Sequence, residues 1–438
     1  MQSRAPLRAV EKKLRELLYS CNTKVENVLI AGIFNLSSSL TQRNGASVSL
    51  LETGSHISDV LDLFRTHGEL SRTEVMEISG LSRSTVNQRL TSLLSGGLIL
   101  PVKGGESTGG RPSSRFALNA SRAIFLTADI GASGFTVAVC DLSGTALRHA
   151  KRVVDVWEGP DRVLGDVHAA FEEMRGDEDI WGIGIGVPGP VEFAAGRVVN
   201  PPIMTGWDRF DIAGWFSSRY GVAVVVENDA NARAVVESRQ HRSDNLISLK
   251  MGTGIGSGLV FNGQIIRGNE GAAGDIGHTR AAIATDVAAL QCRCGNLGCV
   301  EAYASGWALV RDLQEEGLDV SSVSDVVDLV ARGDISAVRV VRQAGRVLGE
   351  AVAELVSILN PGTIVVSGLL AECDEVLLSG VRERVYQRAL PLATRNLTIT
   401  TSVLGELAGV AGLALITADQ VFHAATIDRL LTEAVASV

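Results

Sequence analysis

The sequence lacks a long apolar segment of the kind that crosses a membrane. Its longest run of apolar and small residues, Leu407 to Ala418, is well short of the roughly 20 residues that such a helix needs. An apolar leader is also missing, because charged side chains interrupt the stretch from Met1 to Ser20. The two absences predict a cytoplasmic protein that does not associate with a membrane.

Cysteine is scarce, with 6 cysteines in 438 residues. Cys21, Cys140 and Cys373 are scattered along the chain with no spacing that suggests pairs, and disulfides rarely persist in the cytosol. The other three cysteines gather in the segment 292–299. This distribution argues against a disulfide framework.

Extremes of composition are absent as well. Hydrophobic residues make up 46% of the chain and charged residues 20%, and the mean hydropathy is +0.21. These values exclude a disordered or fibrous protein and are typical of a globular chain with buried sheets. At about 150 residues per domain, the length predicts two or three domains.

The acidic excess is unevenly distributed. The whole chain has a formal net charge of -9, but residues 1–55 carry 7 basic and 4 acidic side chains, and residues 56–122 carry 8 and 6. Since an acidic body repels phosphates and a basic module attracts them, any DNA contact should belong to the front of the chain. Residues 1–55 themselves show no chemistry; we expect an extension with one short amphipathic helix near Leu7 to Leu18.

Residues 56–122 have the pattern of a winged helix-turn-helix DNA-binding domain. Three short helices are expected. Ser71 and Glu74 form a capping box at the start of the second, and Ser82 caps the third. Two short strands around a Gly-rich wing complete the pattern. A generic three-helix bundle with a solvated polar face is the alternative.

The third helix of this domain should present a polar face suited to bases and phosphates. The predicted DNA-binding residues are Arg83, Ser84, Thr85, Asn87, Gln88 and Arg89 on this helix and Arg111 in the wing. Arginine in a wing can enter the minor groove, although a plain interdomain linker explains the same glycines.

From Ala123 onward, β-strands separated by glycine turns predict an α/β domain over residues 123–438. Two meanders repeat one order of strands and turns, one from Ile124 and the other from Asn245. The repetition predicts a duplicated domain of two lobes, the second at about 240–405, with a ligand cleft between them.

The strongest local motif is Cys292-Arg-Cys294-Gly-Asn-Leu-Gly-Cys299, preceded by His278. Three thiolates and one imidazole complete tetrahedral zinc and leave no position open for catalysis. We therefore predict a structural zinc, the one cofactor, held by His278, Cys292, Cys294 and Cys299. The alternative is a tight turn of reduced cysteines without metal.

Two further segments carry polar or glycine-rich chemistry. Glu227-Asn-Asp-Ala-Asn231 follows an apolar strand, so its polar groups should emerge where α/β sheets place ligands. Asp229 can accept a hydroxyl hydrogen bond, whereas a helix N-cap at Asn228 or Asp229 is the alternative. Gly252-Thr-Gly-Ile-Gly-Ser-Gly258 offers N–H groups to a phosphate, or forms a plain hairpin.

In order along the chain, these motifs resemble those of the ROK family of sugar kinases and sugar-responsive repressors. The matching segments are Glu-Asn-Asp-Ala-Asn at 227–231, Gly-Thr-Gly-Ile-Gly at 252–256, Gly-Ala-Ala-Gly-Asp-Ile-Gly-His at 271–278 and Cys-x-Cys-Gly-x-x-Gly-Cys-x-Glu at 292–301. The resemblance covers about residues 56–420. It implies an actin-like (ribonuclease H-like) two-lobed fold with zinc, and sugar hydroxyls bound by Asn228, Asp229, His278 and Glu301.

Departures from the family pattern bear on activity. The kinases carry an Asp-x-Gly-Gly-Thr-Lys-like first phosphate loop, whereas this chain has Asp129-Ile-Gly-Ala-Ser-Gly134. This difference predicts that the ATP site has lost part of its phosphate-binding motif. Asp229 stands where the kinases have their base, but a carboxylate also simply binds a sugar hydroxyl. Asp275 replaces the usual Glu and joins the predicted effector-binding residues.

With a winged helix-turn-helix in front of such a domain, we predict a transcriptional repressor. It should bind a double-stranded DNA operator as a homodimer or homotetramer and respond to a sugar-like effector. Two alternatives stay open: an ATP-dependent sugar kinase with an accessory DNA-binding domain, and a DNA-binding protein whose effector lobe is vestigial.

Overall fold

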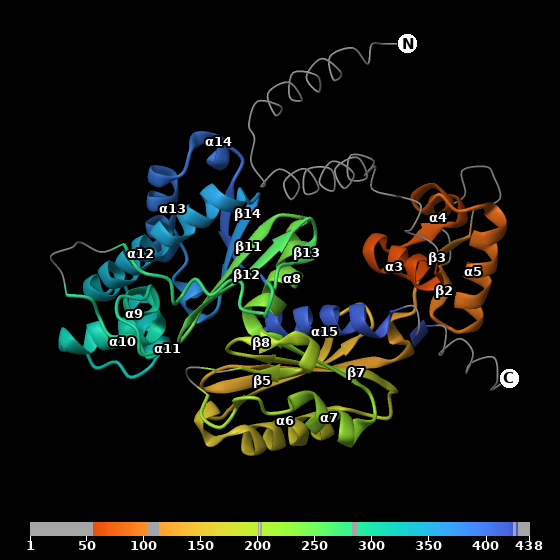
Figure 1. Cartoon of the computed structure of the whole chain (residues 1–438), viewed down its shortest axis with the longest axis horizontal. Coiled ribbons are helices and arrows are strands. Elements are labelled where there is room, and N and C mark those ends of the chain that lie inside the picture. Colours follow the sequence, from red (N-terminus) through yellow and green to blue (C-terminus); the bar gives the residue numbers. More distant parts are fainter. Residues whose placement is uncertain are drawn as a thin grey trace, which may run out of the picture.

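The computed structural model describes residues 56–102, 114–199, 201, 204–282, 288–423 and 426–427. The predicted N-terminal extension and Arg111 in the wing lie outside these residues. Within them, a small module lies to one side of a larger body made of two lobes (Figure 1). No helix in this part of the chain is long and apolar enough to cross a membrane.

The small module is a winged helix-turn-helix. Its elements are α3 (Ile57–His67), β1 (Leu70–Ser71), α4 (Arg72–Ser79), α5 (Arg83–Ser95), β2 (Ile99–Val102) and β3 (Arg115–Leu118). The predicted capping box forms, since Ser71 and Glu74 each accept a hydrogen bond from the other's backbone N–H, and Gly80 ends α4 in the left-handed conformation. The wing is a three-stranded sheet in the order β1-β3-β2.

The first lobe is a five-stranded sheet with α6 and α7 on one face and the C-terminal helix α15 (Leu407–Val421) on the other. It contains β4 (Ile124–Ile130), β5 (Gly134–Asp141), β6 (Ala146–Val153), α6 (Pro160–Met174), β7 (Ile180–Val187), β8 (Val191–Glu192), β9 (Arg197–Val198), α7 (Ile212–Tyr220) and β10 (Ala223–Asn228). The sheet order is β10-β7-β4-β5-β6, in which β4, β5 and β6 form an antiparallel meander and β7 and β10 run parallel to β4. Val163, Phe171 and Phe216 bury α6 and α7 against this sheet.

The second lobe repeats this topology. It contains β11 (Leu246–Met251), β12 (Ile255–Phe261), β13 (Gln264–Ile265), α9 (Glu301–Ala304), α10 (Gly306–Glu315), α11 (Val323–Ala331), α12 (Ile335–Leu359), β14 (Thr363–Ser367), α13 (Glu375–Arg388), α14 (Pro391–Thr394) and β15 (Thr398–Thr401). Its sheet order, β13-β12-β11-β14-β15, again combines a three-strand antiparallel meander with two parallel strands. The duplicated, two-lobed architecture expected from the sequence is therefore present.

Two helices each follow one lobe in the sequence but pack against the sheet of the other. Helix α8 (Asp229–His241) follows the last strand of the first lobe and packs against β11 and β12, whereas α15 (Leu407–Val421) follows the last strand of the second lobe and packs against β4 and β7. The two helices also pack against each other, so closely that the Ala232 carbonyl leaves no room for a Cβ on Gly412. Only glycine permits this approach.

The winged-helix module shares a hydrophobic core with the first lobe and α15. Val60, Leu61 and Phe64 of α3 belong to one buried cluster with Ala414 and Ala418 of α15. A continuous apolar interface of this kind restrains the relative motion of two domains. The winged-helix module is thus packed on the body through α3.

Candidate functional site

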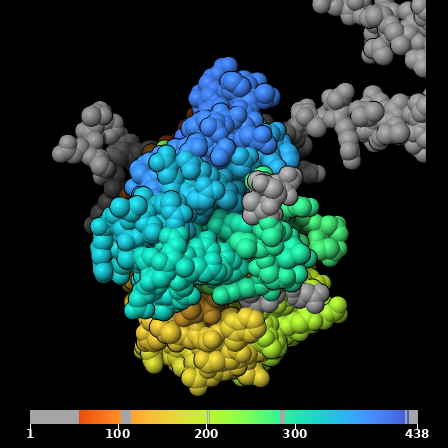
Figure 2. Space-filling model, turned by 90° about the vertical axis from the view of Figure 1, so that its left-hand side faces the viewer, coloured from red at the N-terminus to blue at the C-terminus, as the bar shows by residue number. Residues whose placement is uncertain are grey.

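A cleft of about 1750 Å³ lies between the two lobes. Figure 2 shows the lobes meeting, the first in yellow and the second in cyan and blue. All of the predicted effector-binding residues line this one cavity, although they come from separate segments of the sequence. They are Asn228, Asp229, Asp275, His278 and Glu301.

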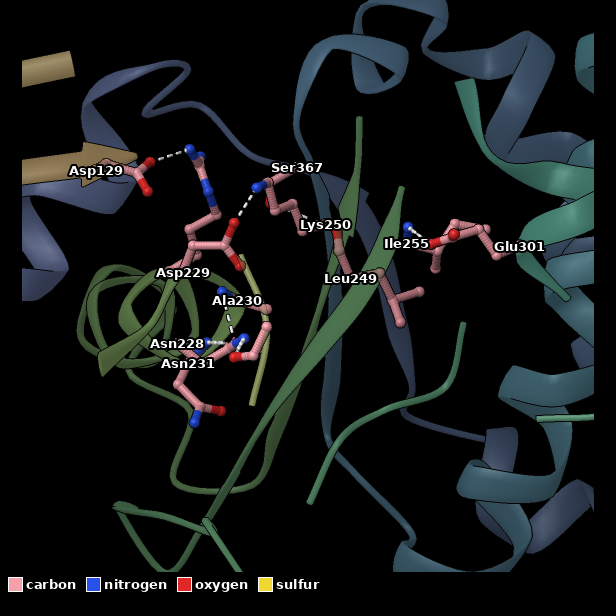
Figure 3. A network of polar contacts seen from close by, with 12 residues as sticks. Asp129, Asn228, Asp229, Ala230, Asn231, Leu249, Lys250, Ile255, Glu301 and Ser367 are labelled. Carbon is pink, nitrogen blue, oxygen red and sulfur yellow. Dashed lines mark hydrogen bonds and ion pairs between the residues drawn. The ribbon is translucent and has the colours of Figure 1, made fainter. Parts of the chain in front are cut away.

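Asp229 is paired with a lysine. It is the first residue of α8, and its buried carboxylate forms an ion pair with the ammonium group of Lys250 on β11 (Figure 3). Burial raises the pKa of Asp229, and the positive charge of Lys250 opposes this rise. Asp229 thus presents to the cleft a carboxylate that Lys250 holds in place.

Asp129 at the end of β4 is engaged in the same way. Arg233 on α8 donates to its Oδ2 atom at 2.6 Å, and the two side chains are 8% and 7% exposed. Phosphoryl transfer requires carboxylates that are free to hold magnesium. In this structure Asp129 and Asp229 both pair with cations of the protein, and the buried Oδ1 atom of Asp129 has no hydrogen-bond partner.

The segment Gly252–Gly258 forms a hairpin. The N–H of Gly252 donates to the carbonyl of Gly254 at 3.0 Å, that of Ile255 to the carboxylate of Glu301 at 2.9 Å, and that of Ser257 to the carbonyl of Gly274 at 3.1 Å. These backbone donors are used within the protein, as the hairpin alternative requires.

Asn228 acts as the N-cap of α8. Its Oδ1 atom accepts hydrogen bonds from the N–H groups of Ala230 and Asn231, and its Nδ2 atom donates to the Gly189 carbonyl at 2.9 Å. The N-cap alternative is therefore the observed role of this side chain. Asn228 fixes the start of α8 and, with it, the position of Asp229; a direct contact with an effector stays a prediction.

Asp275, His278 and Glu301 form a second polar group in the cleft. The Nδ1 atom of His278 lies 2.7 Å from Asp275 Oδ1, and its Nε2 atom lies 4.0 Å from Glu301 Oε1. The hydrogen bond with Asp275 raises the pKa of His278 to about 9. Glu301 accepts hydrogen bonds from the Ile255 N–H at 2.9 Å and from Trp307 Nε1 at 3.4 Å, so its carboxylate is held in place at the cleft wall.

His278 also lies beside the cysteine cluster. Donor atoms of His278, Cys292 and Cys294 lie within 4.8 Å of one another, and the Sγ atom of Cys299 is 3.7 Å from that of Cys294. A turn at Gly295, with φ of 94°, folds the segment back on itself. Because three thiols and an imidazole are a donor set that zinc prefers, the residues present fit this metal.

The predicted reading face of α5 is open to solvent. Arg83, Ser84, Asn87 and Gln88 are exposed, and Thr85 and Arg89 are half-buried. Arg89 differs from the others because it donates to the His56 carbonyl at 3.0 Å and so joins α5 to the start of α3. Most of the face is therefore available to a duplex.

Two basic side chains of the cleft are absent from the predicted set. Lys250 carries a sequence signal, since it is the one charged residue in the strand Leu246–Met251. Arg233 lies one helical turn after Asp229, so the two side chains share a face of α8. Its partner Asp129 is 104 residues away in the sequence, and no local sequence pattern predicts that contact.

Together, the fold and the cleft define a two-lobed, actin-like ligand-binding protein with a winged helix-turn-helix in front. Residues 125–420 match the family model described as ROK family, and residues 56–101 match that of the IclR helix-turn-helix domain. The chain therefore belongs to the ROK family.

Several relatives that match about four fifths of the chain are regulators. The xylose repressor of Bacillus spizizenii is 29% identical over 356 residues, which cover 79% of this chain and 90% of the repressor. NagC of Escherichia coli, a DNA-binding transcriptional dual regulator, is 26% identical over 374 residues, or 82% of this chain and 91% of NagC. The crystal structure of a ROK family transcriptional regulator, homologous to the E. coli MLC protein, matches with a TM-score of 0.73 and 25% identity over 86% of this chain and 98% of that one.

Kinases of the family match a shorter part of the chain. The glucokinase of Thermotoga maritima is 28% identical over 312 residues, which cover 67% of this chain and 96% of the kinase. A glucokinase from Streptomyces griseus, solved with glucose and AMPPNP, matches with a TM-score of 0.61 and 28% identity over 68% of this chain and all of that one. The additional DNA-binding module places this chain in the repressor branch of the family.

Proposed function

We propose that the chain is a transcriptional repressor that binds a double-stranded DNA operator with its winged helix-turn-helix and a sugar or sugar derivative in its cleft. One observation carries the proposal. The cleft gathers hydroxyl-binding groups in a molecule that also exposes a reading helix, while Asp129 and Asp229 are held in ion pairs. The effector would change operator affinity through its different affinities for two states of the protein.

In this function, the polar groups of the cleft recognise adjacent hydroxyls of one polyol. Asp229, Asp275 and Glu301 supply carboxylate acceptors from both lobes. An analogue that lacks a required hydroxyl would leave buried polar atoms unpaired, at a cost of roughly 1–3 kcal/mol. Because Asp275 is one methylene shorter than the family's usual Glu, either the bound sugar lies closer to it, a bulkier derivative fills the gap, or a water molecule bridges it.

Zinc would serve as a structural ion in this protein. Held by His278, Cys292, Cys294 and Cys299, it would tie together the segments that carry His278 and Glu301, which supports the effector end of the cleft. A homodimer or homotetramer would present paired reading helices to the two half-sites of a palindromic operator.

The test combines gel shifts with titration calorimetry on the full chain. An operator is first selected by genomic footprinting, and neutral, amino and phosphorylated sugars are then titrated, including D-xylose, D-glucose and N-acetylglucosamine. We expect one sugar to change operator affinity by at least about 5-fold. Asp229→Ala should lose sugar binding and the response but keep its operator affinity. Equal sugar binding by both proteins, or loss of operator binding by a folded Asp229→Ala protein, would contradict the assignment.

An ATP-dependent sugar kinase is the second candidate, because Asp229 is retained and glucokinases match both lobes. A coupled assay with ATP, magnesium and the same sugars separates the two functions. The ion pairs of Asp129 and Asp229 lead us to expect no turnover. Sugar-dependent ADP formation that is lost in Asp229→Asn would favour the kinase.

A further inference from the structure

A network of charged residues lies between the DNA-binding module and the body. Arg65 of α3 lies 2.6 Å from Asp62 and 2.6 Å from Asp419 of α15, and its side chain is 6% exposed. Arg239 of α8 lies 3.6 Å from the same Asp419 oxygen, and Phe422 packs on the Arg65 guanidinium at 5.0 Å. The network therefore joins three helices, one of which belongs to the DNA-binding module.

Helix α8 spans the distance from this network to the cleft. It begins at Asp229, which lines the cleft and pairs with Lys250. Ten residues later, at about 1.5 Å per residue, it carries Arg239, which lines a small cavity together with residues of α3. One helix thus contacts the proposed effector site at one end and the DNA-binding module at the other.

Close packing leaves α8 little room to absorb a movement. The Ala232 carbonyl leaves no space for a Cβ on Gly412 of α15, and the Ala230 carbonyl leaves none on Gly258 of β12. Interiors packed in this way switch between discrete arrangements instead of deforming gradually.

The two sides of the network belong to different lobes. Helix α8 packs on the sheet of the second lobe, whereas α15 and the DNA-binding module share a core with the first. Arg239 and Asp419 therefore lie on either side of the α8–α15 contact, which is where a rotation of one lobe against the other would have to be taken up.

We propose that α8 couples the cleft to the DNA-binding module, with Arg239 as a positioning residue that acts through Asp419 on Arg65. This coupling rests on the proposed function and adds the path by which a sugar in the cleft acts on the DNA-binding module. A sugar that draws the lobes together moves α8, and the altered Arg239 contact changes the orientation of α3. Because α3 and α5 share one core, the reading helix moves with it.

The experiment compares full-length variants in operator binding with and without D-xylose, D-glucose and N-acetylglucosamine. Arg239→Gln should keep sugar affinity and sugar-free operator affinity within about 2-fold of wild type. Its sugar-induced change in operator affinity should fall from at least about 5-fold to less than about 2-fold. Arg239→Lys should retain most of the response, and Arg242→Gln, at an exposed position beside the same helix end, should behave as wild type.

A second variant tests the partner in the network. Asp419→Asn should also lose the response, and adding Arg239→Gln to it should cause no further loss, because Asp419→Asn already breaks the Arg239 contact together with the Arg65 contact. A full response in Arg239→Gln overturns the coupling role and leaves the proposed function standing. A parallel loss of sugar or operator affinity would mean a general defect and overturns it too. If no sugar changes the operator affinity of wild type, the proposed function fails and the coupling fails with it.

Discussion

The two lobes share one topology but supply different parts of the site. Each has a three-strand meander followed by two parallel strands. Between β13 and α9, the second lobe inserts residues 266–300, which carry Asp275, His278 and the cysteine cluster. In the first lobe, a short connection joins β6 to α6 at the corresponding place. The repeated strands thus form the cleft, and the unrepeated insertion supplies its distinctive chemistry.

The lobes also contribute opposite charges to α8. The first lobe offers the carboxylate of Asp129 to Arg233, and the second offers the ammonium group of Lys250 to Asp229. Both partners of α8 lie where the sheets end at the cleft (Figure 3). These two ion pairs therefore tie α8 to both lobes.

The largest effect should come from breaking the first-lobe pair. Arg233→Met leaves the buried Asp129 carboxylate without its cation, which should lower the free energy of unfolding by about 3–5 kcal/mol. Urea unfolding followed by circular dichroism measures this change. The double variant Asp129→Asn, Arg233→Met removes both charges and should recover most of the loss. A loss below about 1 kcal/mol in the single variant would show that Asp129 is solvated.

Breaking the insertion of the second lobe should affect the ligand instead of the whole fold. Cys294→Ser should lose stoichiometric zinc and weaken sugar binding by about 10–100-fold, because the metal orders the segments around His278 and Glu301. Metal analysis and calorimetry on the same sample measure both. Cys373→Ser changes a buried cysteine outside the cluster and should keep its zinc. Zinc-free protein that still responds fully to sugar would refute the structural role.

Local signals made much of the fold predictable from sequence. The capping box of Ser71 and Glu74 and the left-handed Gly80 determine where α4 begins and ends, and both act within a few residues. The apolar runs that form the buried strands from Ile124 onward are equally local. The two-residue strand β1 was missed because it exists only through its pairing with β3.

The candidate site was predictable in its motifs but not in its charge pairs. Its carboxylates, histidine and cysteines lie in compact segments, and the structure brings the carboxylates, the histidine and Cys294 to one cleft. The pairing of Asp129 with Arg233 depends on how α8 crosses between the lobes, as does the route from Asp229 to Arg239. Such contacts are decided by tertiary packing, which periodicity and spacing do not encode.

The DNA-binding module offers a comparison with the cleft, because its predicted contacts face solvent. Arg83→Ala should reduce discrimination between operator and mismatched duplex by roughly 1–3 kcal/mol, since a bidentate base contact is lost. Arg89→Ala should weaken all duplexes similarly. Competition gel shifts with matched and mismatched duplexes distinguish the two outcomes. If neither substitution changes DNA affinity, α5 does not form the docking face.

The smallest effect tests whether the module and the first lobe unfold together, as their shared core implies. Glu74→Ala removes the side chain that accepts the Ser71 N–H at 2.7 Å and should cost roughly 1 kcal/mol at pH 7. The Ser71 backbone hydrogen bond lowers the pKa of Glu74, so the charged carboxylate stabilises the fold above the ordinary pKa. This contribution is lost as the pH falls through the lowered value, and the difference between wild type and variant should shrink in acid. Glu77→Ala, an exposed acid on the same helix, is the control.

The same variant shows whether the two domains unfold together. A single calorimetric transition that is shifted in Glu74→Ala supports a joint unfolding unit, whereas a separate early transition would show that the shared core does not unite the two domains.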